Sequence, residues 1–384
     1  MRRGGRSLGQ MATDEIGKVG GIVATVVVFV MLMIVLAVLA MVCVNALAAS
    51  PWGVFSVGMT IPIAIGMGLW LRFVQPGKIT QVSFVGFGLL IAVIIGGRWV
   101  AESSFGHYLH LSPKTLVWAM IIYGFLAAVL PVWVLLTPRD YLSTFMKVGT
   151  ITILALGIII VRPLVEMSAV TEFAFNTAGP VFAGTLFPFL FITIACGALS
   201  GMHAMVSSGT SPKMVEKETQ VRMIGYGGML MESFVAIMAL AAAVSLSPGI
   251  YFSMNTSTAT MNKLAGPETV AAAPCKTTDD PEHHCEKLAE VAVGNLGVTD
   301  AQGRKPTPEW DSWDDNGNPK TYTGAEALER LASDVGEPNV VSRTGGAPTL
   351  SVGIAHILHQ IGGGRAMMGF WYHFAIMFEA LFIL

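Results

Sequence analysis

The sequence predicts an all-α, polytopic membrane protein with about seven complete transmembrane helices and a partial eighth. Charged residues make up 12% of the 384 residues, against about 25% in an ordinary soluble domain. Apolar residues make up 53%, and the mean hydropathy is +0.63. The 53 residues between Lys18 and Arg72 carry no formal charge, which is enough for two spans of about 20 residues and a turn.

Apolar runs of spanning length follow one another along the chain after an N-terminal segment, residues 1–19. We expect seven complete helices within residues 20–246 and a partial one at the end. Their expected bounds are 20–46, 52–71, 80–97, 115–136, 141–161, 178–200, 223–246 and 368–384. Tryptophans lie near several of these ends, as an interfacial aromatic belt predicts; they are Trp52, Trp70, Trp99, Trp118 and Trp133.

The loops between the expected spans lie alternately on the two sides of the membrane, and lysine and arginine are unequally divided between these sides. Eleven lie on the side of the N-terminus, whereas the opposite short connections hold only Arg98, Lys114 and Arg162. The positive-inside rule therefore predicts a cytoplasmic N-terminus. Seven crossings would place residues 247–349 outside, where eight Lys and Arg face fifteen Asp and Glu. We call residues 247–349 the outer segment.

The outer segment is expected to contain short helices. Thr323 and Glu326 form a capping-box pattern that opens one of them, whereas residues 311–322, rich in Asp, Asn, Gly and Pro, predict a loop. Residues 348–361 are apolar but too short to span a bilayer. Residues 350–384 are thus expected to hold an interfacial helix and a truncated final transmembrane helix.

Two cysteines of the outer segment, Cys275 and Cys285, lie ten residues apart. Outside the cytoplasm a disulfide that closes this loop is the default expectation. A metal site that adds His283 and His284 is the alternative, but the spacing matches no common zinc pattern. The sequence therefore predicts a disulfide, no metal and no cofactor.

Glu232 stands in the middle of the apolar run 223–246. A carboxylate near the bilayer midplane costs several kcal/mol unless it is protonated, paired or facing water, so such groups tend to mark ion, proton or substrate pathways. We predict that Glu232 couples transport to protons. The structural alternative is a protonated glutamic acid that ties two helices together by a hydrogen bond.

A polar stretch, residues 197–213, follows the run 178–200 and carries no charge before Lys213. A helix that unwinds here would line a cavity, because exposed backbone at membrane depth survives only in such places. The predicted substrate-binding residues are His203, Ser207, Ser208, Gly209 and Thr210. The alternative is a tight helix seam at Gly197 and Gly201 followed by an ordinary cytoplasmic loop.

His373 and Glu379 lie in the last apolar run, six residues apart, so they do not share a helix face. Both are candidate cavity residues. The sequence shows no Walker motif, dinucleotide fingerprint or nucleophile elbow. We therefore predict a protein that is not an enzyme, uses ion or proton coupling, and has a lipid bilayer but no nucleic acid as a partner.

Three longer strings resemble one family. They are GALSGMHAMVSSGTSPK at 197–213, GYGGMLMESFVAIMALAA at 225–242 and GFWYHFAIMFEALFIL at 369–384. They closely resemble stretches of the carbon starvation protein A family. Members of this family are bacterial inner-membrane transporters that are implicated in the uptake of peptides when carbon runs short. Some members are implicated in the uptake of pyruvate together with protons. The resemblance extends over essentially the whole chain and includes the predicted substrate-binding residues and Glu232.

The resemblance implies the fold of the amino acid–polyamine–organocation superfamily, an inverted repeat with broken helices. Family members begin with several spans before the stretch that opens this chain, and they continue beyond its last residue. The chain is therefore expected to be an internal portion of such a transporter. Two other function classes stay open, namely a starvation sensor that binds a ligand in the outer segment and a membrane enzyme or redox subunit.

Overall fold

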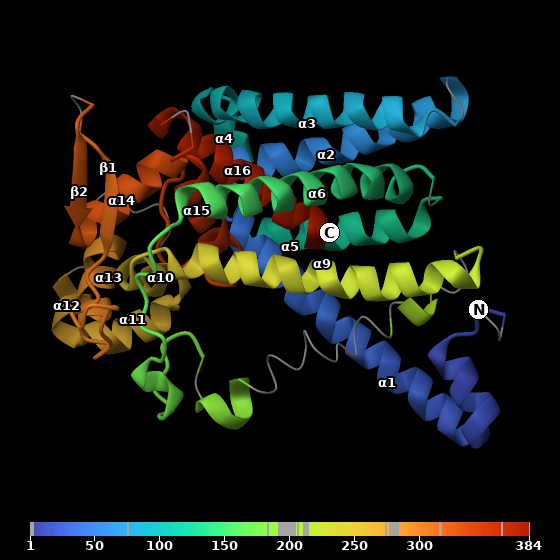
Figure 1. Ribbon diagram of the computed structural model, residues 1–384, viewed down its shortest axis with the longest axis horizontal. Coiled ribbons are helices and arrows are strands. Elements are labelled where there is room, and N and C mark those ends of the chain that lie inside the picture. Colours follow the sequence, from blue (N-terminus) through green and yellow to red (C-terminus); the bar gives the residue numbers. More distant parts are fainter. Residues whose placement is uncertain are drawn as a thin grey trace. The chain divides into compact units, whose positions relative to one another are not determined.

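The computed structural model describes residues 4–74, 77–131, 133–182, 184–190, 205, 207–209, 215–272, 275, 284–314, 317–361 and 364–383. Most of these residues are helical (Figure 1). The chain divides into two compact units. The first comprises residues 1–39, 173–178 and 184–237, and the second comprises residues 40–172, 179–183 and 238–384.

The first unit contains most of two long helices, α1 (Leu8–Leu47) and α9 (Glu218–Val244). Gly17 interrupts α1 with a φ of 89°, a conformation that glycine adopts without the steric cost of a side chain. Most of the apolar part of α1 follows this interruption, and α1 and α9 are each long and apolar enough to cross a membrane. A π-helical turn (Leu186–Leu190) belongs to the same unit.

Four helices form the bundle of the second unit: α2 (Pro51–Leu69), α3 (Ile79–Glu102), α6 (Leu136–Val161) and α16 (Gly364–Ile383). Each of them packs against the other three (Figure 1). A π-helical turn (Trp70–Val74) extends α2. Three helices of the bundle, α2 with this extension, α3 and α6, are long and apolar enough to span a bilayer, and with α1 and α9 they make five such helices in the described chain. The mostly helical character expected of a membrane protein is thus confirmed, while the number of spans stays a prediction.

Close packing of small and large side chains holds the bundle together. Gly86 of α3 lies against Met67 of α2 and Leu142 of α6, and a Cβ built on it would come within 2.8 Å of Leu142 Cδ2. Small residues at such crossings allow the close van der Waals contacts that drive helix association in lipid. The bundle core consists of Ile63, Met67, Val82, Leu90, Ile94, Leu142, Met146, Phe374, Met377, Phe378 and Leu381.

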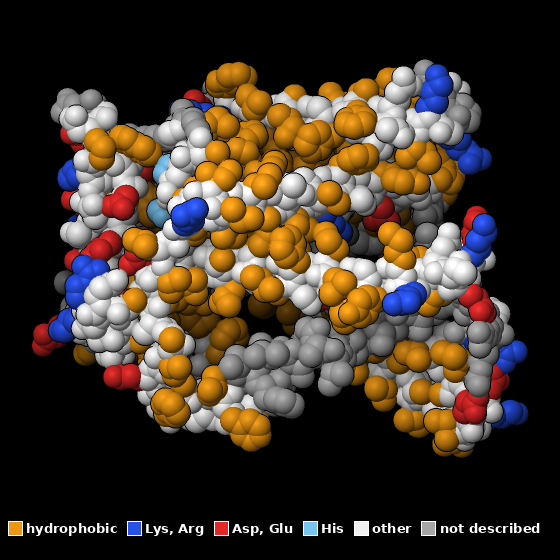
Figure 2. Space-filling model, in the orientation of Figure 1, with side chains coloured by type: hydrophobic (Ala, Val, Ile, Leu, Met, Phe, Trp, Pro, Cys, Tyr) orange, Lys and Arg blue, Asp and Glu red, His pale blue; other side chains and the backbone are white. Residues whose placement is uncertain are grey.

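The outside of the bundle is also apolar. Figure 2 shows hydrophobic side chains along α3 and α6, whereas charged side chains gather over the outer segment and around the ends of helices. Phe84 and Trp99 of α3 are 62% and 68% exposed, and Ile159 of α6 is 67% exposed. Such a surface suits a hydrocarbon environment, because proteins surrounded by water rarely expose apolar patches of this size.

One helix ends earlier than the sequence predicts. α5 runs from Pro113 to Val129, whereas the expected span continued to residue 136. Leu130 has extended backbone with a ψ of 146°, as the residue before a proline prefers, and Pro131 follows it. The apolar composition of residues 130–136 concealed this proline stop, and α6 begins at Leu136, before its expected start at 141.

The outer segment is a folded part of the second unit, and its core continues into the end of α1, α2 and α16. Its helices are α10 (Pro248–Asn255), α11 (Thr258–Ala265), α12 (Pro267–Ala272), α13 (His284–Gly294), α14 (Gly324–Val335) and the start of α15 (Ala347–Leu358). The side chains of Leu288, Leu328 and Leu331 are fully buried.

Outside this segment, the short helical turn α4 (Gly106–Leu109) packs against α2 and α3.

Residues 311–322 are not the predicted loop. They lie in an antiparallel hairpin in which β1 (Glu309–Trp313) pairs with β2 (Pro319–Thr323), with Trp310 opposite Tyr322. Trp310 and Ser312 are buried while Asp311 between them is exposed, which is the alternation of a strand with one face on a core. The Asp, Asn, Gly and Pro residues of this stretch predicted a loop because they are typical of the turn that joins two strands. A predominantly helical chain therefore contains this one two-stranded sheet in its described residues.

Candidate functional site

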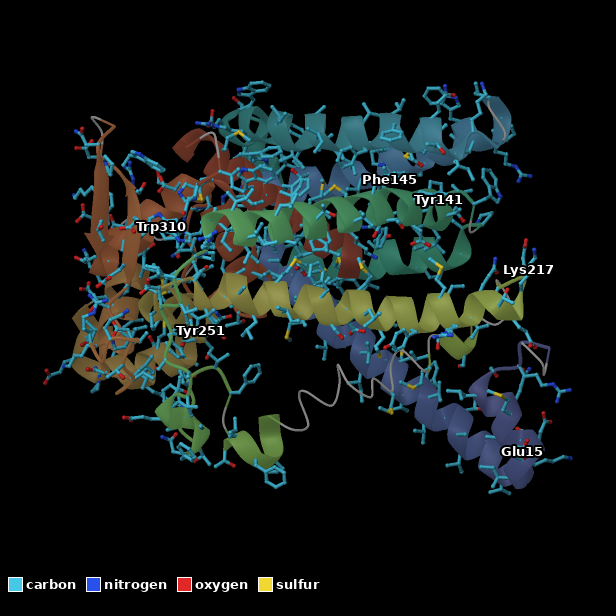
Figure 3. The ribbon with its side chains drawn as sticks, viewed as in Figure 1. Glu15, Tyr141, Phe145, Lys217, Tyr251 and Trp310 are labelled. Atoms are coloured by element: carbon cyan, nitrogen blue, oxygen red, sulfur yellow. A yellow bond between two sulfur atoms is a disulfide. The ribbon has the colours of Figure 1, made fainter. Side chains whose placement is uncertain are left out.

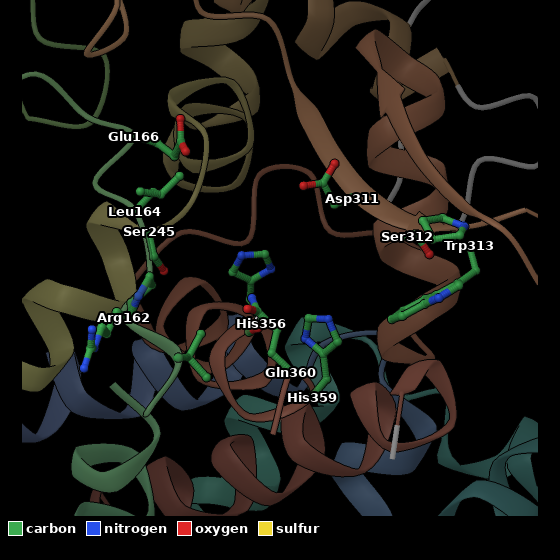
Figure 4. A pocket seen from close by; sticks show the side chains of 13 residues that line it. Arg162, Leu164, Glu166, Ser245, Asp311, Ser312, Trp313, His356, His359 and Gln360 are labelled. Atoms are coloured by element: carbon green, nitrogen blue, oxygen red, sulfur yellow. Dashed lines mark hydrogen bonds between the residues drawn. The ribbon is translucent and has the colours of Figure 1, made fainter. Parts of the chain in front are cut away.

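A pocket of about 410 Å³ opens where the outer segment meets the ends of α6 and α9. We call it the outer pocket. Figure 4 shows His356 and His359 of α15 at its floor, Asp311, Ser312 and Trp313 of β1 on one side, and the segment after α6 on the other. Its lining residues are Val161, Arg162, Pro163, Leu164, Glu166, Ser245, Asp311, Ser312, Trp313, Pro319, His356, His359 and Gln360.

The two histidines are adjacent because His359, which caps the end of α15, lies three positions after His356, and this spacing places them on one helix face. Their ring centroids lie 5.6 Å apart, and the ring of Trp313 meets His359 edge-on at 5.7 Å. Burial lowers the pKa of His356 to about 4, with the neighbouring His359 adding to the fall. Burial also lowers the pKa of His359, so both rings are neutral at neutral pH.

The hairpin wall of the outer pocket is attached to α14 through Asp334. Its Oδ2 accepts hydrogen bonds from Trp310 Nε1 at 3.1 Å and from the Ser312 hydroxyl, and Arg330 Nε lies 3.6 Å from Oδ1. Figure 3 shows Trp310 at this end of the molecule. The two hydrogen bonds to Oδ2 and the ion pair at Oδ1 connect the strand that carries Asp311 and Trp313 to α14.

Backbone pairing holds the opposite wall. Arg162 ends α6 in the left-handed conformation, with a φ of 53°. The Glu166 amide then donates to the Val244 carbonyl at 2.9 Å, and the Glu166 carbonyl accepts from the Ala301 amide at 3.1 Å. The chain after α6 is thus fixed between the end of α9 and the outer segment.

The outer pocket offers charged groups of both signs and neutral donors. Asp311 and Glu166 supply carboxylates, while Arg162 supplies a guanidinium. A neighbouring pocket of about 450 Å³ shares Glu166, Ser245, Asp311 and His356 with it. Among the described residues no group of three or more His, Cys, Asp or Glu could hold a metal ion. This chemistry suits a small polar organic molecule.

A second polar site lies fully buried between the start of α2, the loop after α14, and α16. Arg343 Nη2 lies 2.9 Å from Glu337 Oε2, and the Ser50 hydroxyl donates to Glu337 Oε1 at 2.7 Å. Burial raises the pKa of Glu337, an effect that Arg343 and Ser50 oppose. Charges removed from water in this way tend to be retained only in pairs.

His373 of α16 completes this cluster. Its Nε2 lies 3.9 Å from Glu337 Oε1, and its ring stacks on Trp52 with centroids 3.9 Å apart. Trp52 in turn donates from Nε1 to the Ile94 carbonyl of α3 at 2.8 Å. We call Ser50, Trp52, Glu337, Arg343 and His373 the buried cluster, which joins α2, α3, α16 and the outer segment.

Comparison with known families gives a match over nearly the whole chain. The model of the family described as carbon starvation protein CstA matches residues 1–307 and 312–384. The chain belongs to the carbon starvation protein CstA family.

Individual CstA-family relatives match the chain over its whole length. It is 52% identical to "Peptide transporter CstA" of Mycobacterium tuberculosis (strain ATCC 25618 / H37Rv), covering 45% of that protein, and 50% identical to the protein of that name from Escherichia coli (strain K12), covering 49%. It is 47% identical to "Pyruvate/proton symporter BtsT" of Escherichia coli (strain K12), covering 50%. The chain thus spans about half the length of these relatives. No solved structure matches it.

The polar stretch of this CstA-family chain is described only in part. Ser207, Ser208 and Gly209 are helical, and the Ser208 hydroxyl donates to the Met205 carbonyl at 2.8 Å. His203 and Thr210 lie outside the described residues. The described residues do not reach the unwound backbone that was predicted around them, so the broken helix stays a prediction. The expected span at 178–200 also lies partly outside the described residues.

Glu232 lies in the middle of α9, as expected, and is exposed on the surface of the described chain. His373 belongs to the buried cluster and is 0% exposed, whereas Glu379 is half-buried further along α16. The structure thus brings His373 together with other polar groups, without placing Glu379 beside it. Cys275 and Cys285 are joined by a disulfide.

Sequence reasoning missed most of the polar groups that the CstA-family structure brings together. His356 and His359 had a signal, because two titratable residues three apart in a short apolar helix are unusual. Glu337 and Arg343 had no such signal in the sequence, since they lie in a loop. This loop becomes buried through contacts of α14 with α16. Their burial follows from contacts distant in sequence.

Proposed function

We propose that the full natural protein containing this chain imports a small carbon source, a peptide or pyruvate, together with protons during carbon starvation. The observation that carries the proposal is the full-length match of this chain to relatives of both kinds, peptide transporters and a pyruvate/proton symporter. Because the match has similar strength in both cases, the substrate stays either of the two. No enzyme activity and no cofactor belong to the proposal.

The arrangement of ionisable groups supports transport. Glu337, Arg343 and His373 are almost completely buried in a protein whose helices are predominantly apolar. His373 lies in an expected transmembrane helix, where ionisable groups commonly serve proton or substrate pathways, and Glu337 and Arg343 meet it from the outer segment. The outer pocket, with its carboxylates and its guanidinium, would be a first contact for a polar solute.

We assign roles to the residues singled out from the sequence. Glu232 carries the coupling proton, and the polar stretch holds the substrate through His203, Ser207, Ser208, Gly209 and Thr210. His373 and Glu379 belong to the walls of the pathway. The inverted-repeat fold with broken helices is part of this proposal, because it explains a polar, uncharged stretch next to a spanning helix.

We place the protein in the bacterial inner membrane as a multi-pass protein. The excess of Lys and Arg on one side supports a cytoplasmic N-terminus and an extracytoplasmic outer segment. The disulfide between Cys275 and Cys285 agrees with this side, since disulfides persist in oxidising compartments. The outer pocket would then face the incoming solute.

The test is uptake of labelled pyruvate and a labelled dipeptide into proteoliposomes that hold the full natural protein. We expect an imposed inward proton gradient to drive accumulation of at least one solute. Glu232→Gln should abolish gradient-driven uptake and leave folding intact, because the amide cannot exchange a proton. Glu102→Gln, at an exposed ion pair with Arg98, is the matched control and should transport normally.

Two results would contradict the proposal. Absence of uptake of both solutes by the unaltered protein would exclude these substrates. Normal gradient-driven uptake by Glu232→Gln would exclude the coupling role of Glu232 while leaving transport itself in place.

A further inference from the structure

Arg139, in the first turns of α6, is a buried cation without a counter-ion in the described part of the chain. It is 4% exposed. None of its three guanidinium nitrogens, Nε, Nη1 and Nη2, has a hydrogen-bond partner among the described residues. A guanidinium has five N–H donors and cannot be deprotonated under ordinary conditions. The whole donor capacity of this side chain is therefore unused.

One aromatic side chain accompanies Arg139. The guanidinium carbon lies 5.0 Å from the ring centroid of Tyr123 on α5, a cation–π contact. The Tyr123 hydroxyl is buried as well, and it too lacks a hydrogen-bond partner among the described residues. A cation–π contact offsets only part of the cost of removing a guanidinium from water. The pair thus presents an unmatched positive charge and an unused hydroxyl side by side.

The start of α6 adds a second attraction for an anion. Leu135, the residue before the helix, is 2% exposed and provides no side-chain cap. The first amides of a helix lack partners within the helix, and together with the helix dipole they favour a negative charge. In α6 these are the amides of Leu136 and Thr137, because Pro138 has no N–H and the Arg139 amide donates to the Leu135 carbonyl at 3.2 Å. An uncapped helix start next to a buried arginine is a combination that suits an anionic ligand.

The two ordinary roles of an arginine near a helix end do not account for this one. An arginine that reaches the lipid headgroups keeps its charged end in water, but Arg139 is almost completely covered. An ion pair would satisfy it, but no carboxylate oxygen of the described residues lies within 4 Å. Asp140, the next residue, is exposed and makes no such pair, so its charge acts on Arg139 only from a greater distance.

We propose that Arg139 and the Tyr123 hydroxyl bind the carboxylate of the transported solute, an inference that rests on the proposed function. A carboxylate is the charged group that pyruvate and a peptide have in common. It accepts two parallel hydrogen bonds from a guanidinium and still has a lone pair for a hydroxyl. One such site would bind the carboxylate of pyruvate or of a peptide, although the remaining parts of these solutes differ.

The test compares each acid with its amide in equilibrium binding and in uptake, with the full natural protein. The pairs are pyruvate with pyruvamide, and alanylalanine with alanylalaninamide. The unaltered protein should prefer the acids by about 100-fold, because a site built for a charged partner rejects an analogue that lacks it. Arg139→Gln should remove this preference by weakening acid binding about 100-fold with little effect on the amides.

Three further variants separate recognition from folding. Arg139→Lys keeps the charge but loses the two-pronged geometry, so acid binding should weaken by about 10-fold. Tyr123→Phe keeps the ring and loses the hydroxyl, and should weaken acid binding by about 5-fold. Arg98→Gln, at an exposed arginine of α3, should leave the acid-to-amide ratio unchanged. If Arg139→Gln fails to fold, the other two substitutions at this site still decide.

The outcomes distinguish this inference from the proposed function. If the unaltered protein binds neither acid, the proposed function fails. If it binds the acids and the acid-to-amide ratio is the same in Arg139→Lys, Tyr123→Phe and the unaltered protein, the carboxylate site is wrong although transport stands. A uniform loss of acid and amide binding would indicate a structural arginine and would likewise overturn the site.

Discussion

At the scale of single residues, Glu337 and Arg343 show how much depends on pairing. Both are buried, at 6% and 3% exposure, and each satisfies the other. The exposed pair of Arg98 and Glu102 has the same chemistry with side chains that are more than half exposed. Exposed pairs contribute about 0–1 kcal/mol, whereas loss of one partner of a buried pair leaves an uncompensated charge.

We expect Arg343→Met to lower the free energy of unfolding by about 3 kcal/mol, because it leaves Glu337 buried without its counter-ion. Thermal unfolding of the purified protein, followed by loss of helical signal, measures this. The double variant Glu337→Gln with Arg343→Met should recover part of the loss. Arg98→Met is the exposed control and should change stability by less than about 1 kcal/mol. Equal effects at the two arginines would contradict the importance of the buried pair.

Single residues of the site could be predicted only where local sequence carries a signal. Glu232 and His373 stand out because polar groups are rare in apolar runs. His356 and His359 were detectable by the same argument. Glu337 is a charged residue in an acidic loop, so its contact with Ser50, 287 residues away, has no local trace. Arg139 lies between two expected spans and has no local signal, because burial by neighbouring helices leaves no pattern in the sequence.

At the scale of elements, hydropathy predicts where most long helices lie, since lipid requires continuous apolar helices of sufficient length. α2, α3 and α6 follow this rule closely. Departures have local causes: Pro131 follows the early end of α5, and alternating burial in β1 builds a hairpin where turn residues predicted a loop. Short elements of the outer segment obey soluble-protein rules, which hydropathy does not capture.

Helix contacts depend on glycine at one further crossing. A Cβ on Gly353 of α15 would lie 2.4 Å from the Ala242 carbonyl oxygen at the end of α9. We expect Gly353→Ala to lower the free energy of unfolding by about 1–3 kcal/mol, because backbone must move to admit the methyl group. Gly88→Ala in α3 has open space around it and should be neutral. Hydrogen exchange of the α15 amides would report the difference, and equal protection in both variants would contradict this packing.

At the scale of the whole molecule, the second unit combines two environments. The core of the bundle is surrounded by an apolar exterior, while the outer segment has a charged surface, a disulfide and a core that it shares with the end of α1, α2 and α16. The buried cluster joins them, because Ser50 and His373 come from the bundle whereas Glu337 and Arg343 come from the outer segment. Folding of the outer segment is therefore coupled to the packing of α2 and α16.

The proposed orientation makes a prediction about accessibility. A membrane-impermeant maleimide applied to intact cells should label Lys305→Cys in the outer segment and should label Thr13→Cys only after permeabilisation. Both positions are exposed, whereas the native Cys43 is buried and Cys275 and Cys285 are bonded to each other. The unaltered protein is the control for background labelling. The reverse pattern would invert the orientation.

The stacking of Trp52 on His373 gives this protein a built-in optical reporter. An imidazole in van der Waals contact with an indole quenches its fluorescence more strongly once the imidazole is protonated. We expect the emission of Trp52 to change when His373 gains or loses a proton, without any attached dye. The chain has eight tryptophans, so the signal is the difference between the unlabelled protein and His373→Phe. A flash or stopped-flow experiment that follows this difference tests whether protons reach the junction of bundle and outer segment during transport.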